Sequence, residues 1–94
     1  MNILFVHQSF PGQYRHILRA LSVQGCHQLV GLGINPLNED IPADVKYFQY
    51  PINTPNTPNI HEWMIDFESK FIRGFACGMA AQKLFNQGFK PDII

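Results

Sequence analysis

Hydrophobic and polar residues in the first quarter of the chain follow the pattern of a strand, a turn and a helix. Residues 2–7 are a continuous, partly β-branched apolar run, which is typical of a strand buried on both faces of a parallel sheet. Residues 8–12 have turn chemistry, and Gly25 is placed to end the helix in the left-handed conformation. Between them, apolar residues recur at the spacing of one helix face: Tyr14, Ile17, Leu18 and Leu21. This order of elements predicts the first half of a βαβ unit.

The middle of the chain predicts two more strands joined by irregular segments. Residues 28–32 are apolar like the first strand, and residues 45–50 alternate in period two, as a strand near a sheet edge does. Residues 35–44 carry two prolines and three acidic residues and predict a surface connection. Prolines at positions 51, 55 and 58 exclude both helix and ladder from residues 51–59, which we expect to be extended.

A long helix is predicted from Glu62 to Gln87, and Gly88 is placed to close it. Its apolar stripe follows the i, i+3/i+4 spacing: Met64, Phe67, Phe71, Gly74, Phe75, Gly78, Ala81, Gln82 and Phe85. Glycine lowers helix propensity by about 1 kcal/mol relative to alanine. We therefore expect the sheet or a neighbouring helix to pack closely against Gly74 and Gly78, with contact to a ligand as the alternative.

The last residues predict the beginning of a fourth strand. Asp92, Ile93 and Ile94 follow a helix exit and need continuation into further β-branched residues. In a doubly wound sheet, this strand would lie on the far side of the first. The predicted fold class is α/β, a partial doubly wound parallel sheet of order 3-2-1-4 with helices on both faces, truncated at the fourth strand. We expect residues 1–94 to be one domain and the amino-terminal piece of a longer polypeptide.

Composition excludes several classes of protein. With 46% hydrophobic and 15% charged residues, the 94-residue chain predicts a packed globule. Seven basic residues balance seven acidic ones, which argues against a nucleic-acid partner. The longest apolar run, residues 3–6, is too short for a transmembrane segment, and the start lacks the pattern of a signal peptide. Cys26 and Cys77 are too few for a disulfide scaffold, which favours the cytoplasm, and both are interpreted as structural.

The turn after the first strand is the best candidate for chemistry. In open parallel sheets, ligands bind beyond the carboxyl ends of the strands, where the strand order reverses. Gly12 allows backbone amides to approach a ligand, and the following helix directs its positive end there. No acidic residue precedes Glu39, so we expect an anion to meet little repulsion. The alternative is an ordinary Pro-Gly turn, since the chain has neither a P-loop nor a Gly-x-Gly-x-x-Gly motif.

The histidines admit two interpretations each. His7 is either a ligand contact or a buried, hydrogen-bonded residue, and His61 is either a site residue or, as we favour, a helix cap. His16 and His27 are interpreted as surface or packing residues. The four histidines lack metal-ligand spacing, so no metal site and no cofactor is predicted. Ser9 has no identifiable base partner.

Residues 2–16, with the run His7-Gln8-Ser9-Phe10-Pro11-Gly12-Gln13, resemble the start of the family 4 group of retaining glycosyltransferases, in particular a bacterial subgroup. Supporting similarities are residues 25–27, residues 57–63, Arg73-Gly74 and residues 88–94. The resemblance covers essentially the whole chain.

The resemblance implies a glycosyltransferase with two Rossmann-like domains, of which this chain supplies the amino-terminal, acceptor-side part. It implies a nucleotide-sugar donor without a metal, and a sugar or lipid-linked acceptor. The donor diphosphate would lie near Ser9, Phe10, Pro11, Gly12 and Gln13. Acceptor-side candidates are His7, His61 and Arg73. The catalytic residues of relatives lie beyond Ile94, so we expect this piece alone to be inactive. The expected location is the cytoplasm, including the inner face of the membrane.

A second hypothesis is a non-catalytic α/β module for binding or assembly. Its basis is the exposed edge of the predicted sheet and the apolar, glycine-bearing long helix. Under this hypothesis, the chain would form a dimer through that sheet edge or through the long helix.

Overall fold

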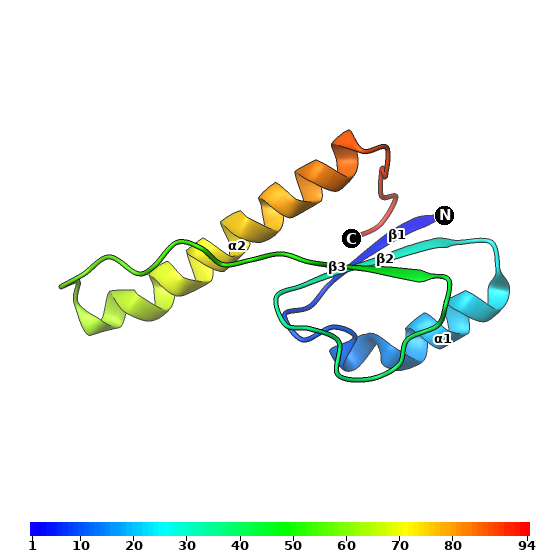
Figure 1. The fold of residues 1–94 in the computed structure, drawn as a ribbon, viewed down its shortest axis with the longest axis horizontal. Coiled ribbons are helices and arrows are strands. Elements are labelled where there is room, and N and C mark those ends of the chain that lie inside the picture. Colours follow the sequence, from blue (N-terminus) through cyan, green and yellow to red (C-terminus); the bar gives the residue numbers. More distant parts are fainter.

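The computed structural model describes residues 1–94 as a three-stranded parallel sheet with two α-helices (Figure 1). The elements in chain order are β1 (Asn2–Val6), the 3-10 turn η1 (Gly12–Tyr14), α1 (Arg15–Gln24), β2 (Gln28–Gly33), β3 (Val45–Gln49) and α2 (Glu62–Asn86). The strand order is β1-β2-β3, and both pairs are parallel. The predicted α/β class, the parallel sheet and the edge position of β3 are confirmed.

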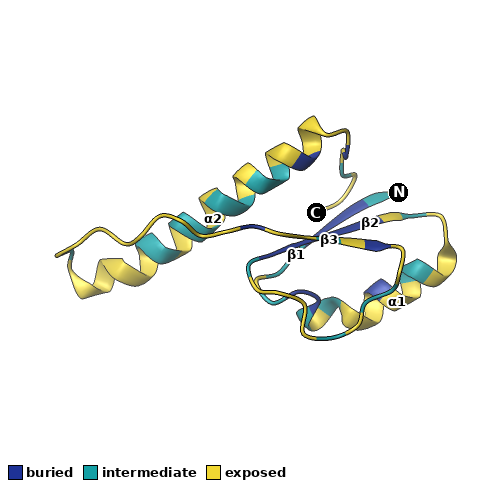
Figure 2. Ribbon diagram, in the orientation of Figure 1, coloured by how far each residue is buried: buried dark blue, intermediate teal, exposed yellow.

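The sheet separates two apolar layers, one against each helix. Ile3 and Phe5 of β1 pack with Leu18 of α1 on one face, whereas Leu4 packs with Leu84 of α2 on the other. Successive strand side chains point to opposite faces, so an uninterrupted apolar run fills both layers. Figure 2 shows β1 and β2 largely buried between two largely exposed helices, whereas β3 is mostly exposed. The expected helices on both faces are therefore present.

A fourth strand does not form. Ile93 makes one parallel bridge to Ile3, in which Leu4 N–H donates to the Ile93 carbonyl at 2.9 Å. Asn2 N–H donates to the Asp92 carboxylate at 2.7 Å, which fixes the segment beside β1. The bridge lies on the edge of β1 that does not pair with β2, but the predicted 3-2-1-4 order is realised only for its first three strands.

The orientation predicted for α2 is wrong. The side that meets the sheet carries small residues and one leucine: Ala76, Cys77, Ala80, Ala81 and Leu84. Phe67, Phe71 and Phe75 of the predicted stripe are 65–66% exposed. A Cβ added at Gly74 or Gly78 would meet nothing within 4 Å, so no backbone of this chain packs against these glycines. The small residues allow the helix axis to approach the sheet closely, which turns the large rings outward.

The molecule is elongated, 51 × 28 × 18 Å, because the first half of α2 extends past the sheet beside residues 51–60 (Figure 1). The helix ends follow the sequence. Gly25 has φ +71° and its N–H donates to the Ser22 carbonyl, as predicted. The His61 ring caps α2 by accepting the Trp63 N–H at 3.1 Å. Neither helix combines the length and the apolar character that crossing a bilayer requires.

Candidate functional site

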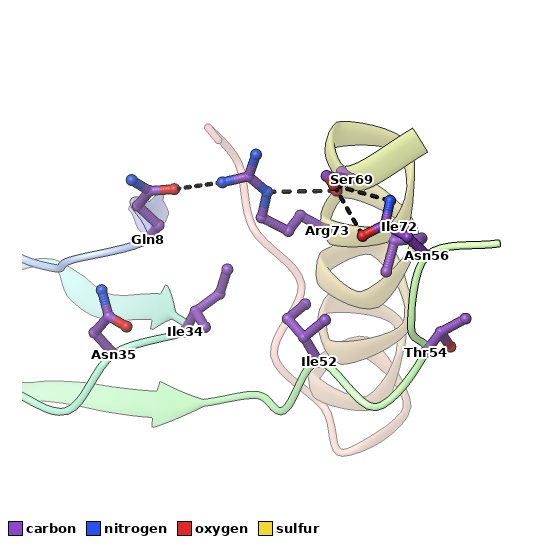
Figure 3. A pocket seen from close by; sticks show the side chains of 9 residues that line it. All are labelled: Gln8, Ile34, Asn35, Ile52, Thr54, Asn56, Ser69, Ile72 and Arg73. Atoms are coloured by element: carbon purple, nitrogen blue, oxygen red, sulfur yellow. Dashed lines mark hydrogen bonds between the residues drawn. The ribbon is translucent and has the colours of Figure 1, made fainter. Parts of the chain in front are cut away.

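A cavity of about 330 Å³ lies where the carboxyl ends of the three strands meet α2 (Figure 3). Gln8 follows β1, Ile34 and Asn35 follow β2, and the segment after β3 contributes the outer wall. The complete lining is Gln8, Ile34, Asn35, Ile52, Thr54, Asn56, Ser69, Ile72 and Arg73. The carboxyl ends of parallel strands share one sheet edge, which is the edge where open α/β sheets bind ligands. The cavity therefore lies where the topology predicts a site.

Arg73 is the only charged residue in this lining. Its Nη1 donates to Gln8 Oε1 at 3.1 Å, and its Nε donates to the Ser69 carbonyl at 3.4 Å. Figure 3 shows the guanidinium reaching from α2 across to the end of β1. These two acceptors, on different parts of the chain, fix the orientation of the guanidinium. Its other N–H groups can donate to a ligand. Arg73, an acceptor-side candidate from the sequence, thus lies in the cavity.

The remaining lining combines neutral polar groups with aliphatic side chains. Asn35 Nδ2 donates to Ser9 Oγ at 2.7 Å, so the amide at the end of β2 is tied to the turn after β1. Ile34, Ile52 and Ile72 supply apolar surface between the amides and hydroxyls. Such a mixture suits a ligand that presents hydroxyl groups at its edge and C–H groups on its face.

Residues 51–60, here named the strap, form the outer wall without regular secondary structure, as predicted. Asn56 Nδ2 donates to Ser69 Oγ at 3.1 Å and to Glu68 Oε1 at 3.1 Å. The backbone N–H and the hydroxyl of Thr57 each donate to the Glu68 carboxylate at 2.6 Å. The strap is therefore held to α2 mainly through one carboxylate.

The hydrogen bonds of the strap should depend on pH. The Thr57 hydroxyl and then the Thr57 N–H, which donate to Glu68, hold the pKa of that carboxyl below its usual range. A lowered folded pKa means that the stabilisation is present above the unfolded pKa and is lost as pH falls through the folded one. We expect the Thr57 amide proton resonance to titrate below the usual glutamate pKa of about 4.3 in NMR spectra.

The variant Glu68→Gln should abolish that titration and shift the Thr57 amide resonance at neutral pH. Glu62→Gln is the matched control, because Glu62 lies on the same helix and has no contact with Thr57. A Thr57 resonance that is insensitive to pH in the unaltered protein would show that the hydrogen bonds between Thr57 and Glu68 do not form in solution.

Two tyrosines near β3 remain protonated at neutral pH. Burial raises the pKa of Tyr47, whose hydroxyl donates to the Asn35 carbonyl beside the cavity. Burial first, and then a hydrogen bond with Cys77, raises the pKa of Tyr50 to about 12. Neither phenol is therefore prepared to act as a base at neutral pH.

The turn after β1 is divided between the core and the surface. Phe10 is fully buried and stacks on Tyr47 with ring centroids 5.3 Å apart, and Pro11 is buried beside it. Their side chains therefore face the core, away from any ligand. Ser9 and Gly12 are half-buried, and Gln13 is exposed. Contact of this turn with a ligand stays a prediction for Ser9, Gln13 and the backbone.

Packing favours glycine at position 12, in addition to the proposed contact of this turn with a ligand. Its φ is +50°, and a Cβ added there would lie 2.6 Å from atoms of the His7 ring. The His7 Nδ1 accepts the Ser9 N–H at 3.0 Å, so the ring supports the turn from inside. His7 does not line the cavity, and its contact with a ligand stays a prediction.

An acidic group lies beside the turn, so the weak repulsion expected for an anion there stays a prediction. Glu39 folds back from the loop after β2, and its carboxylate lies 3.6 Å from Arg15 Nε at the start of α1. Arg15 and Glu39 are 24 positions apart in the sequence, so their proximity in space could not be predicted from it. An anion at the turn would meet a guanidinium already paired with a carboxylate.

Comparison with known protein families identifies a match over most of the chain. The family model described as "Glycosyl transferase family 4 group" matches residues 25–94, which is most of the chain. The chain belongs to the glycosyl transferase family 4 group. Neither the curated proteins nor the solved structures gave a match. The resemblance seen in residues 57–63, in Arg73-Gly74 and in residues 88–94 lies inside the matched range, whereas residues 2–16 precede it.

Within this glycosyl transferase family 4 domain, the structure gathers a different set of residues from the one predicted. Of the predicted residues, Arg73 and Gln8, the first residue of the predicted turn, line the cavity; His61 caps α2 outside it. Sequence reasoning missed Asn35, Thr54, Asn56 and Ser69. Asn35 could have been found, because it is the first polar residue after the second strand. The strap residues carried no such signal, because their place beside α2 depends on the tertiary fold.

Proposed function

We propose that residues 1–94 form the acceptor-side Rossmann-like subdomain of an enzyme that transfers a sugar from a nucleotide-sugar to an acceptor. Membership of the glycosyl transferase family 4 group supports the reaction class. The observation that carries the acceptor-side assignment is the cavity at the carboxyl edge of the sheet, with Arg73 held across it by Gln8.

The acceptor in this proposal is a sugar, either free or linked to a lipid. Its hydroxyl groups would bond to the amides of Asn35 and Asn56, and its C–H face would rest on the isoleucines. Arg73 would bond to an oxygen atom near the reacting hydroxyl. These residues would position the acceptor, and holding a reactant in the right geometry lowers the barrier of a transfer reaction.

The donor diphosphate would lie at the turn of residues 8–13 when a second domain closes over the site. Neither η1 nor α1 has a side-chain cap at its N-terminus, and neither first turn contains an acidic residue. In the reaction, the acceptor hydroxyl oxygen bonds to the anomeric carbon as the bond to the diphosphate oxygen breaks, and the hydroxyl proton passes to the released diphosphate or to solvent. The charge left on the diphosphate needs electrostatic stabilisation.

In this proposal, the groups that act on the donor come from the rest of a longer enzyme. The chain is then the amino-terminal part of that enzyme, and its bridge between Ile93 and Ile3 is the beginning of a fourth strand. No catalytic residue is assigned within residues 1–94, and the piece alone is expected to transfer no sugar.

The variant Gly12→Val tests the role of the turn in the longer enzyme. A valine at φ +50° is strained, and its Cβ would displace the His7 ring and with it the Ser9 amide. We expect turnover and donor affinity to fall by about tenfold or more, as misplaced positioning groups generally cause. The assay is steady-state transfer with a panel of nucleotide-sugars.

Gly25→Ala is the matched control, because it imposes a strained φ of +71° at the other end of α1 with nothing within 4 Å. It should lower stability slightly and leave donor affinity unchanged. If Gly12→Val keeps both turnover and donor affinity while remaining folded, the turn has no part in the mechanism.

A further inference from the structure

The outward face of α2 carries an apolar surface that packs against no other helix or strand. Phe71 and Phe75 lie beside residues 52–54 of the strap, and Lys90 Nζ lies 5.4 Å from the centroid of the Phe85 ring. We name this surface the outer stripe. Its large members are between 47% and 66% exposed: Met64, Phe67, Phe71, Phe75 and Phe85. Met64, Phe67, Phe71 and Phe75 recur at i, i+3/i+4 spacing, and Phe85 continues the same side of the helix ten residues later. In Figure 2 this side of α2 is exposed along the helix, while the opposite side meets the sheet.

Two glycines form notches within the outer stripe. Gly74 and Gly78 are exposed, are four residues apart, and would have nothing within 4 Å of an added Cβ. Glycine is unfavourable inside a helix compared with alanine, and this chain gains no close internal contact in return. Small residues on a helix surface allow the backbone of a second helix to approach closely.

We propose that the outer stripe binds the outer stripe of a second copy of this chain in an antiparallel helix pair. Phe71 and Phe75 are four residues apart, and Gly74 and Gly78 have the same spacing. In an antiparallel pair, Phe71 of one copy therefore lies opposite Gly78 of the other, while Phe75 lies opposite Gly74. Two-fold symmetry repeats both contacts, which is the requirement for an isologous interface.

The same register places Met64 opposite Phe85, an apolar pair near each end, and Phe67 opposite the polar Gln82. A parallel pair would instead bring Phe71 against Phe71 and leave the glycine notches facing each other. The antiparallel arrangement alone fills each notch with a ring. Packing of large against small side chains is what gives helix interfaces interior-like density.

The exposed area is sufficient for a dimer. A buried aromatic side chain removes about 150–250 Å² from water, and Phe67, Phe71 and Phe75 each retain about two thirds of their exposure. Together with Met64, Met79 and Phe85, the residues from two copies reach the lower end of the roughly 1,200–2,000 Å² that specific interfaces bury.

Charge favours a second copy over a lipid surface as the occupant. Helix α2 carries three acidic and three basic residues: Glu62, Asp66, Glu68, Lys70, Arg73 and Lys83. Helices that lie on membranes typically have an excess of lysine and arginine on their polar face. Glycine notches also add nothing to contact with fluid lipid chains. The inference concerns assembly and is independent of the proposed transferase function.

The test is sedimentation velocity of the chain across a dilution series, with two variants in the stripe. Phe71→Glu should raise the dimer dissociation constant by about tenfold or more, as changes at the centre of an interface do. Gly78→Leu fills a notch and should raise the constant similarly, while it increases the helix propensity of the monomer. Gly78→Leu is therefore expected to weaken the dimer while it stabilises the monomer. If Gly78 served only the fold of the monomer, the substitution would not weaken the dimer.

The matched control is Val23→Glu, a change from an apolar to an acidic residue at an 87% exposed position of α1. It should leave the dissociation constant unchanged. A chain that remains monomeric at every concentration overturns the proposal, as does a dimer that Phe71→Glu and Gly78→Leu leave intact. Co-sedimentation of the monomer with phosphatidylcholine vesicles, lost in Phe71→Glu, would assign the stripe to a membrane and overturn it too.

Discussion

Replacing Phe10 by alanine is expected to lower the free energy of unfolding by about 3–5 kcal/mol. Phe10 is completely buried, belongs to the layer between the sheet and α1, and stacks on Tyr47 at 5.3 Å between centroids. A domain of this size has roughly 5–15 kcal/mol of stability in total. The change would therefore unfold a large part of the population under mild denaturing conditions.

The contact of Phe10 with Gly31 adds to this effect. A Cβ at Gly31 would lie 2.6 Å from the Phe10 ring, so the ring rests directly on the backbone of β2. Gly31 itself has no side chain that could fill the space left by the ring. The cavity contribution to the loss should accordingly be large.

Urea denaturation followed by circular dichroism measures the change for Phe10→Ala. Gln13→Ala is the control, because Gln13 is exposed in the same turn and should change stability by less than about 0.5 kcal/mol. A loss below about 1 kcal/mol for Phe10→Ala would mean that Phe10 is not a core residue in solution. In that case the turn would regain Phe10 as a candidate for ligand contact.

Replacing Arg73 by methionine in the longer enzyme is expected to lower kcat/KM for the acceptor by about 10- to 100-fold. The estimate follows from the roughly 1.5–3 kcal/mol that hydrogen bonds to a charged group contribute. Methionine keeps much of the aliphatic stem but removes the guanidinium that bonds to Gln8 across the cavity. The KM for the donor should stay unchanged, because Arg73 lies on the acceptor side of the proposed cleft.

Arg73→Lys should give an intermediate loss, since lysine keeps the charge but not the planar fork that reaches Gln8 and Ser69 together. Lys70→Met is the control: Lys70 is exposed, pairs with Asp66 on the same helix, and does not line the cavity. An Arg73→Met enzyme with unchanged acceptor kinetics, or with a change in donor KM only, would contradict the acceptor-side assignment.

Local pattern was sufficient to predict the elements of the sheet. The apolar run of β1 predicted burial on both faces because each of its side chains has a layer to fill. Gly25 predicted the end of α1 because it directly follows the apolar stripe of the helix and because glycine tolerates the positive φ of a helix C-cap. These predictions depend only on neighbouring residues and on the spacing of apolar positions, both of which can be read directly from one sequence.

Tertiary geometry was not predictable in the same way. Helix α2 is apolar on two sides, and periodicity could not tell which side faces the sheet. The larger residues were expected inside, whereas close approach to the sheet selects Ala76, Cys77 and Ala80. Similarly, the proximity of Glu39 to Arg15 depends on the path of a loop that the sequence does not specify.

The candidate site was predicted in position but only partly in composition. The rule for parallel sheets placed it at the carboxyl edge, and Arg73 was named from a family resemblance. Asn56 and Ser69 entered the lining because the strap folds along α2, where Glu68 holds Thr57. Phe10 and Pro11 are no longer candidates for side-chain contact with a ligand, because both side chains are buried in the core.

The most direct test of the central claim is an NMR titration of the isotopically labelled protein with a panel of free mono- and disaccharides, and separately with nucleotide-sugars. The account predicts that a saccharide shifts the side-chain or backbone resonances of Gln8, Asn35, Asn56 and Arg73, and that Arg73→Met removes those shifts. Saccharide-induced shifts that avoid these four residues, or shifts that persist unchanged in Arg73→Met, would contradict it.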